Sequence, residues 1–449
     1  MRDLLIVAIV GIAAVLAVRR PWIGVLLWTW LSIMNPHRYA WGFSYSAPLA
    51  AIAVGATMVG LLLTSDRKSP FQGGPTVWLF LFTVWVTISW LLGLDVADDY
   101  AKWAKVMKIY FMTFVALMVI GTRYQIIAFA SVTAGSLALL GAKGGLFTLI
   151  TGGTYRVWGP PESFIEDNNE FALSLIVAIP LLYFLFQQSQ PGRRWLRLSL
   201  IVAMALCAIA AIGTYSRGAL LAIAAMAAML WLRSAHKVLL GVVLICATVF
   251  ALPMMPEQWW ERMGTVANYQ DDASAVGRLN AWMVAWSVAK THVFGAGMSY
   301  QHASLFAMFG THETTVRAAH SIYFQVLGNH GFIGLGIYLM IWISTYANAG
   351  WLRRNGSIRA ETRWVADLGA MIQVCLVGYA VGGAFLSLAY FDLPYNIMVM
   401  TVLARRWTER EGWKIEVKQP LLVHLGLRRQ QPRAVAAARL ESSDVVAKR

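Results

Sequence analysis

The stretch TVWLFLFTVWVTISWLLGL, residues 76–94, contains no charged side chain and no proline. It approaches the roughly 20 residues that an α-helix needs to cross the hydrocarbon of a bilayer. Its apolar residues are continuous rather than alternating, which favours a helix over a strand of a closed barrel. The stretch therefore predicts a membrane-spanning helix.

Similar apolar runs recur along the chain. Apolar residues make up 58% of the sequence and charged residues 13%, with a mean hydropathy of +0.59, which excludes an ordinary soluble domain. We expect an all-α polytopic membrane protein of about twelve spans, with eleven or thirteen left open because the first two runs are short and a further run follows Pro394. The candidate spans lie near residues 4–18, 21–34, 47–64, 76–94, 107–121, 124–141, 170–187, 196–213, 217–232, 238–253, 322–347 and 366–388.

The sequence predicts one integral membrane unit, residues 1–404, followed by a basic tail, residues 405–449. Arg19 and Arg20 follow the first apolar run where a signal peptide would carry small residues, so this run is interpreted as a retained first span. Its sidedness is left open. The three cysteines each lie alone in apolar runs and imply no disulfide.

Lysine and arginine collect in several short loops, at 66–68, 192–197, 233–237 and 352–363. Short basic loops remain on the cytoplasmic side of a membrane, so these loops and the tail are predicted to be cytoplasmic. The net charge of +15 is then explained by the basic loops that set the orientation in the membrane and by their contact with anionic lipid headgroups. No nucleic-acid-binding motif accompanies the charge, and no nucleic-acid partner is expected.

Two longer loops are predicted to face outward, residues 151–169 and 254–319. The first is rich in Gly, Pro, Asn and acidic residues, and its Glu162, Glu166 and Asp167 either bind sugar hydroxyls or solvate the loop. The second is nearly neutral and contains GRLNAWMVAWSVAK at 277–290. The apolar spacing of Leu279, Trp282, Val284, Trp286 and Val288 predicts a helix that lies against the spans.

The stretch RAAHSIYFQVLGNHGFIG, residues 317–334, places a histidine at the outer edge of a predicted span. On a continuous helix, His320, Phe324, Leu327, Gly331 and Gly334 share one face, where the glycines allow another helix or a lipid chain to approach closely. A neutral imidazole can accept a proton near pH 7, although most histidines at such positions only pack.

Arg217 and Arg278 also fall on the outward side, which the basic loops otherwise leave poor in cations. A guanidinium binds phosphate through a planar fork and stays charged. A single arginine near a membrane is most often a topology residue, but two of them together indicate an anionic ligand at that height. A lipid diphosphate is the ligand that this position favours.

His320, Ser321, Gly331 and Gly334 resemble the histidine signature of the O-antigen ligases of Gram-negative bacteria. The large outward loop before the histidine and the SRG arginine at 217 extend the resemblance over nearly the whole chain. The resemblance implies a GT-C-like, inverting, metal-independent glycosyltransferase in the bacterial inner membrane. Such an enzyme moves a glycan from undecaprenyl diphosphate to a sugar hydroxyl of the lipid A core at the periplasmic face.

Carried over to this chain, the resemblance implies that His320 is the general base and that Arg217 and Arg278 hold the diphosphate. Further candidates for the cavity rim are Arg156, Asn168, Asn169 and Ser321, while Gly331 and Gly334 are expected to serve helix packing. No cofactor and no metal are expected, because the histidines at 292, 302, 312, 320 and 330 lack the spacing of HExxH.

Other functions stay open. An O-antigen polymerase and a ligase that glycosylates proteins would use the same lipid-linked donor with a different acceptor. A lipid-linked glycan transporter is the alternative from another class, although strong charges lie at predicted span ends rather than near the bilayer midplane. Asp95, Asp98 and Asp99 are interpreted as a solvated cap of an outward loop.

Overall fold

The computed structural model is helical, with no strand among the residues that it describes. These residues are 1–234, 236–251, 257, 259–260, 273–311, 316–416 and 419–427. Helices satisfy every backbone polar group within one segment, which is what a chain of long apolar runs requires in hydrocarbon. The all-α expectation is therefore confirmed for the described part of the chain.

The described helices follow the predicted apolar runs. In chain order they are α1 Arg2–Arg19, α2 Pro21–Met34, the 3₁₀ helix η1 Pro36–Tyr39, α3 Leu49–Leu63, α4 Gly74–Leu91, α5 Val96–Val119, α6 Arg123–Ile150, α7 Asn168–Gln188, α8 Arg194–Gly213, α9 Arg217–Arg233, α10 Lys237–Ala251, α12 Ala273–Thr291, α13 Ala303–Phe309, α14 Ile322–Gly356, α15 Arg363–Gly383, α16 Asp392–Glu409, α17 Gly412–Ile415 and α18 Leu421–His424.

Six described helices are both long and apolar enough to cross a membrane, namely α4, α6, α7, α8, α14 and α15. This pattern is that of a multi-pass membrane protein. The count of about twelve spans stays a prediction. The run after Pro394 forms α16, which continues past the domain boundary expected at residue 404, and residues 428–449 of the tail lie outside the described part.

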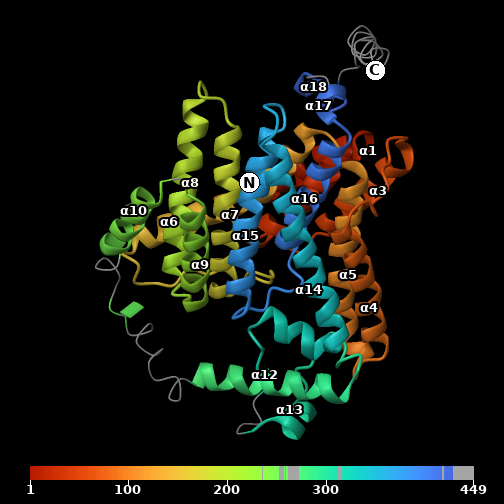
Figure 1. The fold of residues 1–449 in the computed structure, drawn as a ribbon. Helices are drawn as coiled ribbons and strands as arrows, with labels where there is room; N and C mark the ends of the chain where they lie inside the picture. The colour runs from red at the N-terminus through yellow and green to blue at the C-terminus, as the bar shows by residue number, and fades with distance from the viewer. Residues whose placement is uncertain are drawn as a thin grey trace.

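The longer helices run side by side, and α12 lies across one end of the bundle (Figure 1). Helix α7 is apolar on almost every face and is buried against α6, α8 and α15. Helix α16 is likewise buried from Asp392 to Thr408, with the exception of Arg405. The core is therefore built around α7, α15 and α16, with the other helices surrounding them.

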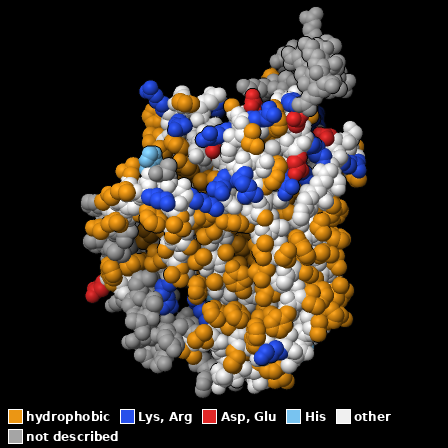
Figure 2. Space-filling model, viewed as in Figure 1, with side chains coloured by type: hydrophobic (Ala, Val, Ile, Leu, Met, Phe, Trp, Pro, Cys, Tyr) orange, Lys and Arg blue, Asp and Glu red, His pale blue; other side chains and the backbone are white. Residues whose placement is uncertain are grey.

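Contacts between loops define two ends of the bundle. At the end that we call the basic end, Arg406 donates to the carbonyl oxygens of Pro70 at 2.6 Å and Leu117 at 2.9 Å. At the opposite end, called the loop end, Arg38 pairs with Glu162 at 2.7 Å. Figure 2 shows lysine and arginine gathered in a band near the basic end, above a broad apolar surface.

The N-terminus lies at the loop end. Asp3 accepts a hydrogen bond from the Ser44 hydroxyl at 2.6 Å, and Arg2 donates to the carbonyl of Tyr39 at 3.3 Å. Helix α1 therefore begins beside the segment that joins α2 to α3. The sidedness that the sequence left open is decided, relative to the bundle, by these contacts.

Helix α14 is interrupted at Gly331, whose φ is 68° and ψ is −174°. His320 lies before the helix and has a φ of 42°. The prediction that His320, Gly331 and Gly334 share one continuous helical face is therefore wrong. His320 lies outside the helix, and the helix is not regular at Gly331.

The interruption is held by a buried polar network. Ser89 Oγ lies 2.8 Å from His330 Nδ1, and Tyr390 Oη lies 2.7 Å from His330 Nε2. Asp99 accepts hydrogen bonds from the amides of Met298 and Ser299 at 2.8 Å and 3.1 Å. Asp99 is buried, so its interpretation as part of a solvated cap is wrong. Its carboxylate instead fixes the chain that follows α12.

Helix α12 confirms the prediction of a helix that packs against the spans, since it contacts α14. Its buried face is made of Ala281, Val284, Ala285 and Val288. Leu279 and Trp286 are exposed, contrary to the predicted apolar face. Small residues bring the α12 backbone close to α14, whereas Leu279 and Trp286 point away from it.

Candidate functional site

His320 stands at the loop end, in the turn that leads into α14. Ser321 is the N-cap residue of that helix and is buried, whereas the His320 side chain is 34% exposed. The positive φ of His320 is uncommon for a residue with a side chain. Such strain persists where surrounding contacts hold the backbone, and it occurs often at functional sites.

A buried carboxylate faces this histidine. Glu170 Oε1 lies 3.8 Å from His320 Nδ1 and accepts a hydrogen bond from the Ser387 amide at 3.2 Å. Glu170 is in the first turn of α7, where the positive end of the helix dipole favours an acid. Sequence reasoning missed this residue. The signal available was an acid three positions after Asp167, which is the N-cap of α7.

Three buried polar atoms of this group have no hydrogen-bond partner within the described part of the chain. They are His320 Nδ1, Glu170 Oε2 and Ser321 Oγ. Buried polar atoms in native proteins are nearly always satisfied, and an exception requires an explanation. A bound ligand that donates or accepts protons would satisfy them.

Asp167 supports Glu170 from the cap of α7. It accepts hydrogen bonds from the backbone and side-chain amides of Asn169, both at 2.8 Å. Burial raises the pKa of the Asp167 carboxyl, but the interactions with the neighbouring Glu170 and Asn169 side chains and with the Asn169 amide outweigh burial, and the pKa lies below its usual value. The charged form of Asp167 is thus the one that this cap stabilises.

The part of α12 that carries Arg278 packs against the segment that carries His320. Trp282, one turn after Arg278, donates from Nε1 to the carbonyl of Ala319 at 2.7 Å and stacks on Phe324, with ring centroids 4.8 Å apart. A side chain added at Gly277 would meet Arg317. This part of α12 is therefore held directly against the chain that carries His320.

Arg217 opens α9 at the same end. Ser216 caps the helix by accepting a hydrogen bond from the Ala219 amide at 3.3 Å. A cation in the first turn faces the positive end of the helix dipole, so Arg217 does not serve helix stability. The neighbouring Gly218 lies against Phe385, whose ring is 6.5 Å from that of Trp282. This apolar chain of contacts links the start of α9 to α12.

The loop 151–167 closes over the turn before Arg217. The Arg156 guanidinium lies 5.7 Å from the centre of the Tyr215 ring, and Tyr215 donates to the carbonyl of Gly153. Asn168 donates to the carbonyl of Thr214 at 2.6 Å and is buried. Asn168 therefore joins two loops through its side chain, whereas Arg156 is exposed.

The two glycines of the signature are farther from the histidine. Gly331 comes nine residues after Ile322, about 14 Å along a helix at 1.5 Å per residue. A side chain at Gly331 would meet the carbonyl of Val293, and one at Gly334 would meet Trp85 and His330. Both glycines thus sit where other segments approach the α14 backbone closely.

A cavity between α14 and α15 begins beside the histidine. Its volume is about 310 Å³. Ile322 and Tyr323, the first residues of α14, line one end, and apolar side chains such as Trp342 and Leu376 line the rest. Predominantly apolar walls of this kind are common in sites that bind apolar ligands.

The described residues contain no group of three or more His, Cys, Asp or Glu side chains that would hold a metal ion. His312 and Glu313, part of the histidine series weighed in the sequence, lie outside the described residues. His330 is engaged on both ring nitrogens by Ser89 and Tyr390.

Comparison with known families adds independent information. Residues 202–339 match the family described as O-antigen ligase. This part of the chain is therefore similar to the O-antigen ligases, and the match covers less than half of the chain. Residues 1–190 match a family of unknown function (DUF5935), and no curated protein matches the chain.

The O-antigen ligase match covers His320, Ser321, Arg217, Arg278 and the signature glycines. Glu170 and Arg156 come from the other matched segment. The contact between Glu170 and His320 therefore joins the two segments into one site. A loop outside both matches, 384–391, completes the site through the amide of Ser387.

Proposed function

We propose that this O-antigen ligase-like membrane protein is an O-antigen ligase. It transfers a glycan from undecaprenyl diphosphate to a sugar hydroxyl of the lipid A core, at the periplasmic face of the bacterial inner membrane. The basic end would then face the cytoplasm, in keeping with the distribution of lysine and arginine.

The observation that carries the proposal is the pair formed by His320 and Glu170, which lies at the loop end, with His320 inside the segment that matches the O-antigen ligases. In the proposed mechanism, Glu170 accepts a hydrogen bond from the Nδ1–H of His320 and so holds the neutral ring with Nε2 free to accept a proton. Nε2 takes the proton from the acceptor hydroxyl, which attacks the anomeric carbon from the face opposite the diphosphate. The 3.8 Å separation is long for a hydrogen bond, as catalytic contacts commonly are before substrate binds.

The leaving diphosphate would be held by Arg217 and Arg278. Negative charge grows on the departing phosphate oxygen as the glycosidic bond breaks, so fixed guanidinium groups stabilise the transition state more than the ground state. The placement of Arg217 against the dipole of its own helix supports a role in binding an anion. The cavity between α14 and α15 would hold part of the polyprenyl chain.

Two related functions use the same chemistry. A polymerase or a protein-glycosylating ligase would share the donor, the base and the arginines, and would differ only in the acceptor. A lipid-linked glycan transporter would need no base and would form no new glycosidic bond. Acceptor specificity and bond formation therefore separate these alternatives.

The test is transfer by purified protein in bilayers, with undecaprenyl diphosphate-linked glycan and lipid A core, in the presence of EDTA. Wild type should form the glycosylated lipid. His320→Ala should be inactive, and His292→Ala, which alters a histidine at the end of α12, should retain activity. Movement of the donor across the bilayer without a new glycosidic bond would favour a transporter. Full activity of folded His320→Ala would show that His320 is not the general base.

A further inference from the structure

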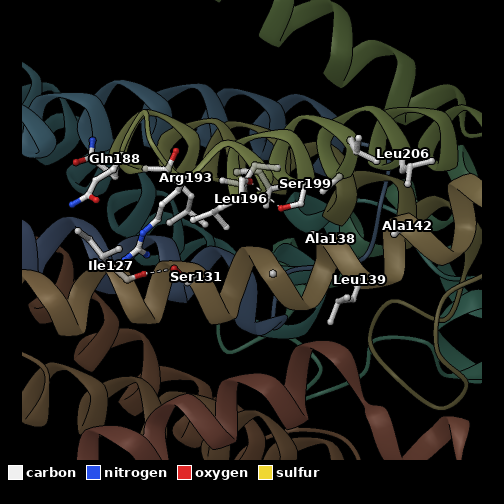
Figure 3. A pocket seen from close by; sticks show the side chains of 18 residues that line it. Ile127, Ser131, Ala138, Leu139, Ala142, Gln188, Arg193, Leu196, Ser199 and Leu206 are labelled. Atoms are coloured by element: carbon white, nitrogen blue, oxygen red, sulfur yellow. Dashed lines mark hydrogen bonds between the residues drawn. The ribbon is translucent and has the colours of Figure 1, made fainter. Parts of the chain in front are cut away.

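A second groove lies at the basic end, between α6 and α8 and beside the end of α7. Its volume is about 760 Å³. Gln188, Ser189, Gln190 and Arg193 line the end that belongs to the loop between α7 and α8, and Leu206 and Ala142 line the other end (Figure 3). His320 is at the loop end, so the groove is separate from the candidate site.

Small residues create the space in this groove. Gly135, Ala138 and Ala142 follow one face of α6, and a side chain added at Gly135 would meet no atom within 4 Å. Leu139 and Leu196 at the margin are 60% and 43% exposed. Both α6 and α8 are long and apolar enough to cross a membrane, so the mouth of the groove faces hydrocarbon.

The charge of the groove is confined to one end. Arg193 is exposed at the N-cap of α8, and Figure 3 shows its side chain pointing toward Ser131 on α6. Arg194 follows and is also exposed. None of the described residues that line the groove is acidic. An apolar trough with a guanidinium at its headgroup end is complementary to an amphiphile with an anionic head.

We propose that this groove binds one anionic phospholipid of the surrounding leaflet. An acyl chain lies along Gly135, Ala138 and Ala142, and the phosphate is bound by Arg193. A guanidinium fork binds phosphate oxygens in pairs, and basic residues at a membrane surface attract anionic lipids. A membrane lipid thus fills the space between α6 and α8 that the small side chains of α6 leave empty.

The test is native mass spectrometry of the full chain, released from micelles that contain equal amounts of phosphatidylglycerol and phosphatidylethanolamine with identical chains. Wild type should retain one phosphatidylglycerol in preference to phosphatidylethanolamine. Arg193→Gln should reduce that preference roughly fivefold, since a basic residue near a membrane surface contributes about 1 kcal/mol. Arg67→Gln, in another loop at the basic end, is the matched control and should retain the preference.

A second variant tests the trough itself. Gly135→Phe adds a ring at a position where a Cβ would meet no atom within 4 Å, so the fold should persist while lipid retention is lost. Gly11→Phe adds the same ring to open space on α1 and should retain the lipid. The proposal is overturned if folded Gly135→Phe keeps its phosphatidylglycerol, or if wild type holds both lipids equally.

Discussion

Nδ1 of His320 lies 3.8 Å from Oε1 of Glu170, so a residue of the O-antigen ligase-like segment meets one from the segment of unknown function. The two residues are far apart in sequence: His320 lies just before α14, and Glu170 lies in the first turn of α7. The proposed chemistry depends on this contact, because Glu170 decides which ring nitrogen of His320 is free to accept a proton.

Glu170→Gln should lower the rate of transfer by roughly ten- to a hundredfold, by analogy with the loss of a carboxylate that orients a metal-bound histidine. The amide keeps the shape of the side chain but cannot stabilise the imidazolium that forms. The measurement is the pH profile of the transfer rate in bilayers. Glu170→Asp should recover part of the rate. A Glu170→Gln enzyme with the wild-type rate and pH profile would show that the carboxylate only supports the fold.

Arg217→Gln should reduce kcat/KM for the lipid-linked donor roughly ten- to a hundredfold, because a hydrogen bond to a charged group contributes about 1.5–3 kcal/mol. Arg217→Lys should recover only part of this loss, since an ammonium lacks the planar fork. Arg233→Lys, at the other end of α9, is the matched control, and its guanidinium donates to Tyr346 at 3.2 Å. Equal kinetics for Arg217→Gln and wild type would exclude Arg217 from donor binding.

Gly331→Ala should destabilise the protein by more than about 1 kcal/mol, because φ at this position is 68° and the new side chain would meet the carbonyl of Val293. Gly336→Ala lies in the same helix with no atom within 4 Å and should be nearly neutral. The apparent melting temperature in detergent compares the two. A Gly331 variant as stable as the Gly336 variant would mean that the interruption of α14 is not required.

Tyr390→Phe should destabilise the fold by about 1–3 kcal/mol, because it leaves Nε2 of the buried His330 without its partner at 2.7 Å. The pH profile of transfer should not change, since His330 is remote from the proposed chemistry. Tyr155→Phe, at an exposed position, serves as the control for melting temperature. A shifted pH profile in a stable Tyr390→Phe protein would assign His330 a part in the reaction.

Asp167→Asn should flatten the dependence of stability on pH in acid. The pKa of Asp167 is lowered in the folded protein, so its contribution to stability is present above the unfolded value of about 3.9 and is lost as pH falls through the folded value. Asparagine caps a helix about as well as aspartate. Between about pH 5 and pH 3 the apparent melting temperature of wild type should fall more steeply than that of the variant. Parallel curves would show that Asp167 contributes no such linkage.

The sequence by itself determined that the chain is helical and apolar, where most helices begin and end, and which loops carry the positive charge. These features depend on local composition, because an apolar run in hydrocarbon has to pair its backbone N–H and C=O groups with each other, and a helix does so within one segment. The histidine motif at residue 320 and the arginines at 217 and 278 were also visible as residue types at particular places.

Only the tertiary structure decided which of these residues meet. Glu170 is a candidate because the turn before α14 packs on the start of α7, which places Glu170 beside His320. Asp99 is buried because the chain after α12 packs on it and donates a backbone hydrogen bond to its carboxylate. The interruption at Gly331 could not be predicted from the sequence either, because the apolar spacing from His320 to Gly334 fits one continuous helix. The physical reason is that periodicity and composition describe neighbours along the chain, whereas a site is made by side chains from several helices whose packing brings them together.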